Sequence, residues 1–295
     1  MAGCVLRQPA SVLRRQASLL CIGIVATTTL PLAACKAHPR RLIVDRIVID
    51  APESLDNRVA ERDAIRLSAG ERLRHDDTIE FRPGQPGGTH VLQLEIGELQ
   101  TAGTRRPGRP VTVHLRPVAE QPEFSAVGVG TTGKDLKAAV MAGFNDAWQV
   151  VTAERILEEK DAAAMISAVA DSDPRLRDFS IERLGERHVA AAVEPLIARL
   201  TVEEDPNLVL RIVGALVMIR DERAIEPLIE LTHRKDPEFV VQIVYALGAL
   251  GSRQAEAYLV TMASGHPDDD VRMAAKQALA ELLRHRGHKN TKATN

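Results

Sequence analysis

The stretch of sequence that decides the fold runs from Asp205 to Leu250 and reads DPNLVLRIVGALVMIRDERAIEPLIELTHRKDPEFVVQIVYALGAL. It opens with an Asp-Pro pair, continues with an apolar run at helical spacing, turns, and adds a shorter apolar run before the next Asp-Pro pair at Asp236. Aspartate accepts hydrogen bonds from free N–H groups at a helix N-terminus, and proline suits the first helical position, which needs no N–H partner. The stretch therefore predicts units of two packed helices.

The same unit recurs on both sides of this stretch. Four dipeptides open the blocks, and their prolines are spaced 32, 31 and 30 residues apart: Asp173-Pro174, Asp205-Pro206, Asp236-Pro237 and His266-Pro267. Self-similarity at such a period is the mark of a solenoid, in which each unit buries its apolar face against its neighbours. We predict a helical repeat array over residues 160–285, in which Gly185 and Gly251 close first helices, followed by a disordered polar tail, 286–295.

These blocks resemble the HEAT-like repeats first named from phycobilin lyases. The matching residues are Arg211, Arg272, Ala246-Leu247-Gly248 and Ile225-Glu226-Pro227-Leu228, and the resemblance covers about 125 residues. It implies an α-solenoid whose second helices line a concave binding side. On that side we expect the partner-binding residues, which are Glu194, Arg199, Glu226 and Glu230. The resemblance does not fix a function, because such arrays mostly bind partners and only a few share the chromophore chemistry of the lyases.

Two arginines of the array are expected to have a structural role. Arg211 and Arg272 share one column of the repeat, that is, the same position in their blocks, where the block between them has Gln242. We expect both arginines to pair with loop acids such as Asp236 and Asp205.

Residues 42–159 have the pattern of a small α+β domain. Apolar β-branched or alternating segments predict strands at 42–49, 90–96, 111–115 and 124–129. Apolar residues at helical spacing predict one helix near 59–67 and a longer one from about Asp135. We therefore predict a small sheet with two helices on one face, followed by the α-solenoid.

The glycine-rich segment Gly128–Asp135 fits the first seven positions of a phosphate-binding loop. Its eighth position should be Ser or Thr, whose hydroxyl holds magnesium, and here it is Asp135, which would repel a triphosphate. The favoured interpretation is a strand-to-helix turn in which Asp135 caps the helix.

The first 34 residues have the three zones of a secretory signal. Three arginines precede an apolar stretch, Ala17–Leu32, which ends in Leu32-Ala33-Ala34-Cys35. This tetrapeptide resembles the lipobox of bacterial lipoproteins. The resemblance implies cleavage before Cys35, acylation (palmitate included) of Cys35, and a tether over residues 35–41. Because Lys36 is not the aspartate that retains lipoproteins in the inner membrane, it also implies an outer-membrane location in the cell envelope. The alternative is an ordinary signal, with Cys35 a bystander.

Composition narrows the possible functions. The net charge of −2 argues against nucleic-acid binding, and the aromatic content of 3% suits helix packing better than an all-β fold. Of the three cysteines only Cys35 would remain in the mature chain, which leaves no internal disulfide. No catalytic motif, metal-ligand spacing or cofactor site emerges from the remaining residues.

The sequence therefore favours a lipid-anchored scaffold that binds another protein and is not an enzyme. One alternative is an envelope-assembly or transport accessory in which the α+β domain carries the specific function. A second alternative is a lyase-like enzyme of the HEAT-like family.

Overall fold

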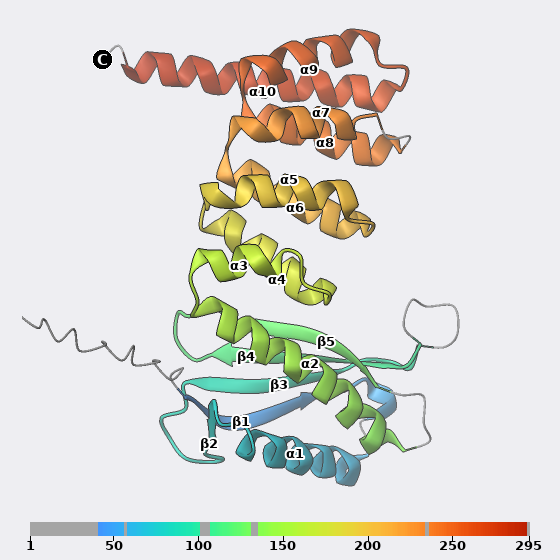
Figure 1. The fold of residues 1–295 in the computed structure, drawn as a ribbon. Coiled ribbons are helices and arrows are strands. Elements are labelled where there is room, and N and C mark those ends of the chain that lie inside the picture. The colour runs from blue at the N-terminus through green and yellow to red at the C-terminus, as the bar shows by residue number, and fades with distance from the viewer. Residues whose placement is uncertain (1–40, 56–57, 101–106, 131–134, 234–235, 294–295) are drawn as a thin grey trace, which may run out of the picture. The chain divides into compact units, whose positions relative to one another are not determined.

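The computed structural model describes residues 41–55, 58–100, 107–130, 135–233 and 236–293. Pro39–Asn295 forms one compact unit, which contains both a sheet and a stack of helices (Figure 1). This architecture confirms the predicted α+β domain followed by an α-solenoid.

The α+β domain is built on one five-stranded sheet of order β2-β1-β3-β4-β5. The strands are β1 (Leu42–Asp50), β2 (Ile79–Phe81), β3 (His90–Ile96), β4 (Arg109–Pro117) and β5 (Phe124–Gly130). β1 pairs in parallel with β2 and β3, while β3, β4 and β5 pair antiparallel. Four strands match the predicted segments. β2 was missed because three residues are too few to show an alternating pattern.

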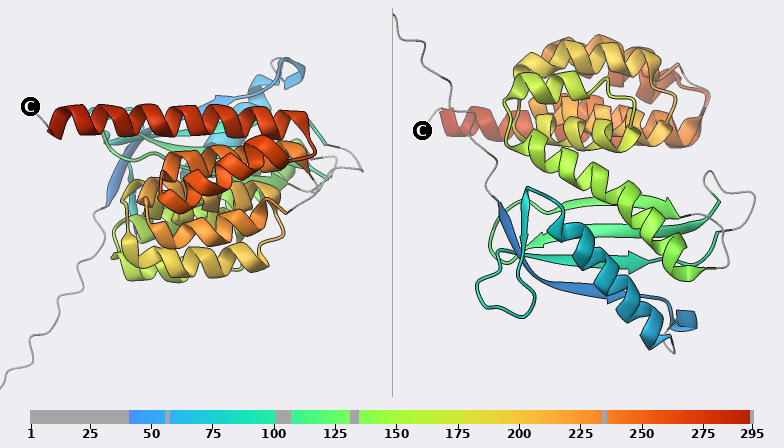
Figure 2. Two further views of the ribbon diagram at one scale, coloured as in Figure 1. Left: turned by 90° about the horizontal axis from the view of Figure 1, so that it is seen from above. Right: turned by 60° about the horizontal axis from the view of Figure 1, so that its bottom comes forward.

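Two helices cover one face of this sheet, as predicted (Figure 2). α1 (Val59–Arg74) contacts β1 and β2, and α2 (Leu136–Glu158) packs along β4 and β5. α2 buries Phe144 and Trp148, whose rings stack with centroids 5.9 Å apart. The Trp148 indole N–H donates a hydrogen bond to Asp76 Oδ2 at 2.9 Å, so the buried ring has its polar partner.

The glycines of the phosphate-loop-like segment serve packing between β5 and α2. A Cβ atom at Gly128 would lie 1.9 Å from the carbonyl oxygen of Gly143, and one at Gly130 would lie 1.8 Å from that of Ala139. Asp135 caps α2, because its side chain accepts a hydrogen bond from Ala138 N at 3.3 Å. The strand-to-helix interpretation is thus confirmed at both ends of the segment; residues 131–134 lie outside the described residues.

Eight helices form the repeat array over the described residues: α3 (Ala162–Ala168), α4 (Pro174–Glu186), α5 (Val193–Val202), α6 (Pro206–Ile219), α7 (Ile225–Leu231), α8 (Pro237–Leu250), α9 (Arg253–Gly265) and α10 (Asp269–Ala293). The first helices of the units, α4, α6, α8 and α10, contact one another in that order, and the second helices form the other layer (Figure 2). Asp173, Asp205 and Asp236 accept backbone hydrogen bonds at the starts of α4, α6 and α8, as predicted.

Two details of the array differ from the prediction, and one confirms it. Gly185 is the last residue but one of α4 and lacks the left-handed conformation of a helix-ending glycine; it is buried, and a Cβ atom there would lie 2.9 Å from Ala215 Cα of α6. Gly251 does end α8, in a left-handed conformation. The fourth block starts α10 at Asp269, since the Asp268 side chain, and not His266, accepts the capping hydrogen bonds.

The tail also differs, because α10 continues to Ala293 through most of the segment predicted to be disordered. A polar composition argues against a buried face, but it does not stop a helix that is already nucleated by its packed first turns.

The predicted domain boundary near residue 160 falls in the turn between α2 and α3. Hydrophobic core residues nevertheless continue from the sheet into the array, and α2 contacts both β5 and α4.

Candidate functional site

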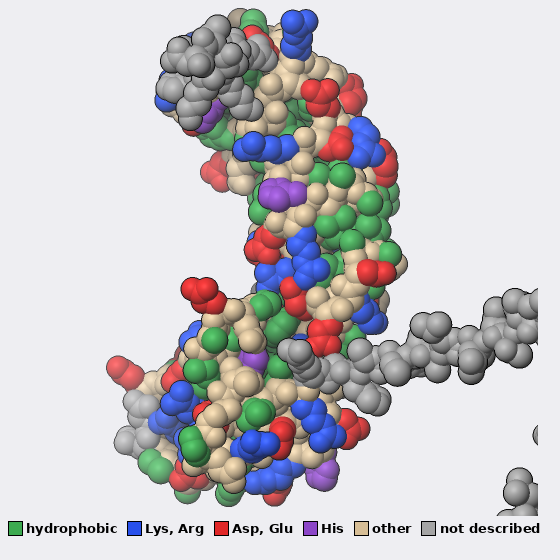
Figure 3. All heavy atoms as spheres, turned by 90° about the vertical axis from the view of Figure 1, so that its left-hand side faces the viewer, with side chains coloured by type: hydrophobic (Ala, Val, Ile, Leu, Met, Phe, Trp, Pro, Cys, Tyr) green, Lys and Arg blue, Asp and Glu red, His purple; other side chains and the backbone are tan. Residues whose placement is uncertain are grey.

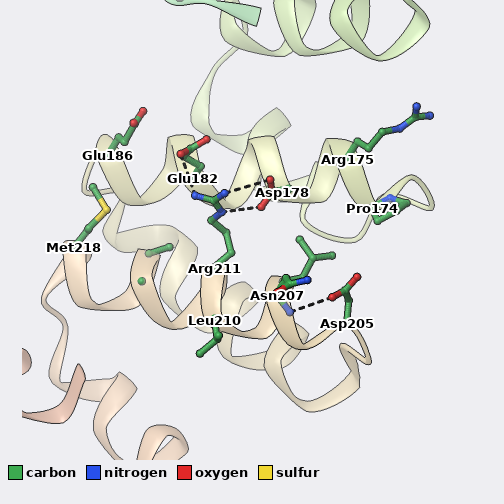
Figure 4. A pocket seen from close by; sticks show the side chains of 13 residues that line it. Pro174, Arg175, Asp178, Glu182, Glu186, Asp205, Asn207, Leu210, Arg211 and Met218 are labelled. Carbon is green, nitrogen blue, oxygen red and sulfur yellow. Dashed lines mark hydrogen bonds and ion pairs between the residues drawn. The ribbon is translucent and has the colours of Figure 1, made fainter. Parts of the chain in front are cut away.

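An open groove of about 810 Å³ lies between α4 and α6, in the layer of first helices (Figure 4). Asp178, Glu182 and Glu186 line it from α4 at four-residue spacing, which puts their carboxylates on one face of that helix. Arg211 and Met218 line it from α6. One wall of the groove is therefore acidic, and the opposite wall carries a basic and an apolar side chain.

Arg211 reaches across the groove to the acidic wall (Figure 4). Its Nε lies 2.7 Å from Asp178 Oδ1, and its Nη1 lies 3.1 Å from Glu182 Oε1. Burial works against the charged form, but the hydrogen bond and the charge of Asp178 raise the pKa of Arg211. These side chains are more than two-fifths exposed, so their ion pairs stabilise the fold little and stay available to a ligand.

The hollow in the groove arises from a missing side chain. Gly214 occupies the exposed face of α6, and nothing lies within 4 Å of the position its Cβ would take. Met218, one turn further along α6, is 41% exposed although it is a large hydrophobic residue. A ligand in this groove would therefore meet carboxylates, one guanidinium and an apolar surface.

A second cavity of about 360 Å³ adjoins the groove where α4 meets the sheet, and it shares Asp178, Glu182 and Arg211 with it. The Arg175 side chain points away from Arg211 (Figure 4). Its Nη1 donates to Val127 O of the edge strand β5 at 2.8 Å, and its Nη2 lies 3.0 Å from Asp146 Oδ1 of α2. These contacts fasten α4 to the sheet.

Glu154 of α2 lines this second cavity and is only 4% exposed. Burial raises the pKa of Glu154 to about 8, against the lowering effects of the Ser125 backbone and of the charge of Arg183. Buried carboxyl groups with raised pKa values in cavities are candidates for acid–base roles. The sequence offered one signal: Glu154 falls on the apolar stripe of its helix, three residues after Val151.

The four residues predicted to bind a partner do not form one site. Glu194 pairs with Arg223 at 3.1 Å, Glu230 pairs with His233 at 3.4 Å, and Glu226 accepts a hydrogen bond from Gln254. These three acids are exposed on α5 and α7. Their partner-binding role stays a prediction.

Arg199 belongs to an internal network. Its Nη2 lies 2.7 Å from Glu203 Oε2, and Arg177 of α4 donates to the same oxygen at 3.1 Å. Burial alone would raise the pKa of Glu203, but these hydrogen bonds and one from Asp205 N lower it. The network ties the loop between α5 and α6 to α4.

The expected role of Arg211 and Arg272 was wrong. Arg211 pairs with Asp178 and Glu182 of the preceding first helix, as described above. Arg272 pairs with Asp269 of its own helix, and not with Asp236 or Asp205, and it donates to the carbonyl oxygens of His266 and Pro267 at 2.6 and 2.9 Å. Arg177 makes the equivalent contacts with the carbonyl oxygens of Asp171 and Ser172, so Arg177, and not Arg211, shares the column of Arg272.

On the face drawn in Figure 3, acidic and basic side chains are interspersed with hydrophobic ones. Among the described residues, no His, Cys, Asp and Glu side chains are grouped so as to hold a metal ion. In the same part of the chain, no helix has the length and apolar character needed to cross a membrane. Cys35 and the leader lie outside the described residues.

Comparison with known proteins supports the repeat assignment. Residues 162–243 match the family model of HEAT repeats. The chain is 33% identical, over 113 residues, to the bilin biosynthesis protein PecE of Mastigocladus laminosus. This alignment covers 37% of the chain and 40% of that relative, so the chain spans well under half of the relative's length.

A solved structure, the complex of CpcE and CpcF of phycocyanin lyase from Nostoc sp. PCC7120, matches with a TM-score of 0.35 and 20% identity. That match covers 43% of this chain and 66% of the other.

The similarity to a bilin biosynthesis protein contradicts two predictions from the sequence. The first was a lipid-anchored scaffold as the main function, and the second was the absence of enzymatic activity. The lyase-like alternative fits the similarity better. The lack of a catalytic motif in the sequence is therefore weak evidence against enzymatic activity.

Proposed function

We propose that this chain is a lyase-like enzyme component that handles a bilin, and that the groove between α4 and α6 is where the bilin is held. The observation that carries the proposal is the 33% identity to a bilin biosynthesis protein over 113 residues. The groove adds support, because its volume of about 810 Å³ lies within the range of about 300–1,000 Å³ that is usual for small-molecule sites.

The chemistry of the groove suits an open-chain tetrapyrrole. Such a molecule has a conjugated apolar body, pyrrole N–H donors and acidic side chains. The carboxylates of Asp178 and Glu182 can accept hydrogen bonds from N–H groups, and the Arg211 guanidinium can pair with a ligand carboxylate. The apolar body would lie over the space left by Gly214 and against Met218.

The test is a titration of the full chain with biliverdin, an open-chain tetrapyrrole, followed by absorbance and by induced circular dichroism. We expect saturable binding at one site per chain. In Gly214→Phe the new ring should occupy the groove and weaken binding by at least about tenfold, which corresponds to about 1.4 kcal/mol.

Gly265→Phe is the matched control, because Gly265 is also an exposed helical glycine with nothing within 4 Å of its Cβ position. This variant should bind biliverdin as the unmodified chain does. Equal binding by both variants would place the bilin elsewhere, and no saturable binding by the unmodified chain would contradict the proposed function.

A protein partner is a further part of this proposal, since a component that handles a bound chromophore needs a surface for the protein that carries it. Glu194, Glu226 and Glu230 on the second helices are the proposed contact residues; Arg199, from the same prediction, is held in the internal network with Glu203.

The location of the protein is a separate proposal. The lipobox-like sequence that ends in Cys35 supports acylation of that cysteine and attachment to the cell envelope, with the outer membrane as the expected site. Cells grown with a clickable fatty acid should label the unmodified chain and leave Cys35→Ser unlabelled. Equal labelling of the two would rule out acylation at Cys35.

A further inference from the structure

Glu154 lies where the α+β domain and the repeat array meet. α2 packs along β5, and it also contacts α4 of the array. Glu154 is in the second half of α2, and the buried oxygen Oε2 of its side chain has no hydrogen-bond partner. A buried polar group without a partner is costly, and it costs more when it carries a charge.

The charged groups that face Glu154 from α4 are mostly committed to other partners. Arg175 is held by Asp146, Asp173 and the carbonyl oxygen of Val127. Arg183 lies 2.6 Å from Glu186 Oε2 and 3.4 Å from Glu158 Oε2. Their positive charges are therefore largely neutralised already.

The other charged groups that face Glu154 either repel a negative charge on it or are paired with other residues. The negative charge of Asp178, also on α4, disfavours ionisation of Glu154. Arg211 of α6 and Glu123, which precedes β5, line the same cavity but pair with Asp178 and Arg116 respectively. On α2 itself, Arg155 pairs with Glu159 at 3.6 Å. An ionised Glu154 would gain a hydrogen bond from the Ser125 backbone and some attraction from Arg183 and Arg175, but the cost of burial outweighs these gains.

We propose that Glu154 is a proton-operated contact between the α+β domain and the repeat array. The neutral carboxyl packs between α2, β5 and α4 and holds the α+β domain and the repeat array against each other. Loss of its proton places a charge there that its neighbours compensate only in part, which draws water into the contact and loosens it. This inference does not depend on the identity of the ligand in the groove.

The pH dependence has a definite sign. The ordinary pKa of a glutamate, 4.5, applies to the unfolded chain, and burial raises the pKa of Glu154 to about 8 in the folded chain. Between these values the folded chain keeps a proton that the unfolded chain releases. This group's contribution to stability is therefore complete below pH 4.5, falls as the pH rises, and is lost above about pH 8. One such group changes the unfolding equilibrium constant by at most about tenfold per pH unit.

The experiment uses the single tryptophan, Trp148, which lies in the α+β domain. Thermal unfolding of the full chain is followed by Trp148 fluorescence, and by far-ultraviolet circular dichroism, which the array dominates. At pH 6 the two signals should change together. At pH 9 they should separate in the unmodified chain but stay together in Glu154→Gln, which keeps the neutral shape at every pH. Glu238→Gln, at an exposed position of α8 away from both cavities, is the control and should behave as the unmodified chain does.

A second measurement needs no variant, so it tests the proposal even if Glu154→Gln does not fold. The carboxyl carbon of Glu154 should titrate in the nuclear magnetic resonance spectrum of the folded chain with a midpoint near 8. A midpoint in the ordinary glutamate range would overturn the proposal. It would also be overturned by coincident unfolding signals at pH 9 in the unmodified chain, or by an equal separation in Glu154→Gln.

Discussion

The two helical layers of the array use their polar side chains differently. In the layer of first helices, Arg211 and the α4 carboxylates border an open groove above Gly214. In the layer of second helices, the predicted recognition residues pair with neighbours, as Glu194 does with Arg223 of the next unit. An exposed charge is thus a poor guide to a binding site when a neighbouring repeat supplies its partner. A missing side chain between charged walls is a better guide.

The largest expected effect tests whether the polar contacts beside the second helices are structural. Glu203→Ala should lower the free energy of unfolding by about 3 kcal/mol, because it removes a buried carboxylate and leaves Arg177 and Arg199 without it. Urea unfolding measures this. A loss below about 1 kcal/mol would show that the network behaves like an exposed ion pair.

Glu203 should also make the stability of the chain fall at acid pH. The hydrogen bonds from Arg199 and Arg177 lower the pKa of Glu203, so its contribution is complete above the unfolded value of 4.5 and is lost as the pH falls through the folded value. Unfolding measured at pH 3 and pH 7 should differ less in Glu203→Ala than in the unmodified chain.

The next effect compares two glycines of the first layer. Gly185→Leu should cost about 2 kcal/mol, since its Cβ would lie 2.9 Å from Ala215 Cα, and overpacking of a close helix contact forces the helices apart. Thermal unfolding is the measurement. Unchanged stability would mean that α4 and α6 can separate freely.

Gly214→Ala should have the opposite sign. Nothing lies within 4 Å of the new methyl group, so the substitution should stabilise the chain by about 0.5–1 kcal/mol through the lower entropy of its unfolded state. A loss of stability in this variant would show that other atoms occupy the space beside Gly214 in solution.

The smallest effect concerns the exposed acids of α7. Reversal of Glu226 and Glu230 to Lys should change the free energy of unfolding by less than about 0.5 kcal/mol, since both side chains are exposed. A larger loss would give these acids a structural role. The same double variant should weaken the binding of a basic protein partner, because it reverses the complementary charge.

The sequence was sufficient for the architecture. Helices that open on Asp-Pro pairs, and strands that alternate apolar and polar residues, have periods that local patterning reveals. Both appear in the structure. The groove could not be predicted in this way. It depends on which residues of α4 and α6 come face to face, and only the packing of successive units determines that. Gly214 looks like an ordinary weak point in a helix until α4 is placed beside it.

The arginines show the same limit. Arg211 and Arg272 look alike in the sequence, yet Arg211 pairs with carboxylates of another helix, whereas Arg272 contacts Asp269 of its own helix and the carbonyl oxygens of the loop before it. A shift of two residues in the repeat register separates these roles, and unequal block lengths hide that shift. Glu154 does not stand out in the sequence, because its apolar neighbours indicate only packing.

The central claim is that the layer of first helices, and not the layer of second helices, holds the bilin. The most direct test compares biliverdin affinity in Gly214→Phe with that in the double variant Glu226→Lys/Glu230→Lys, under one set of conditions. We predict an affinity loss of at least about tenfold in the first and an unchanged affinity in the second. A loss confined to the double variant would contradict the account and return the site to the second helices.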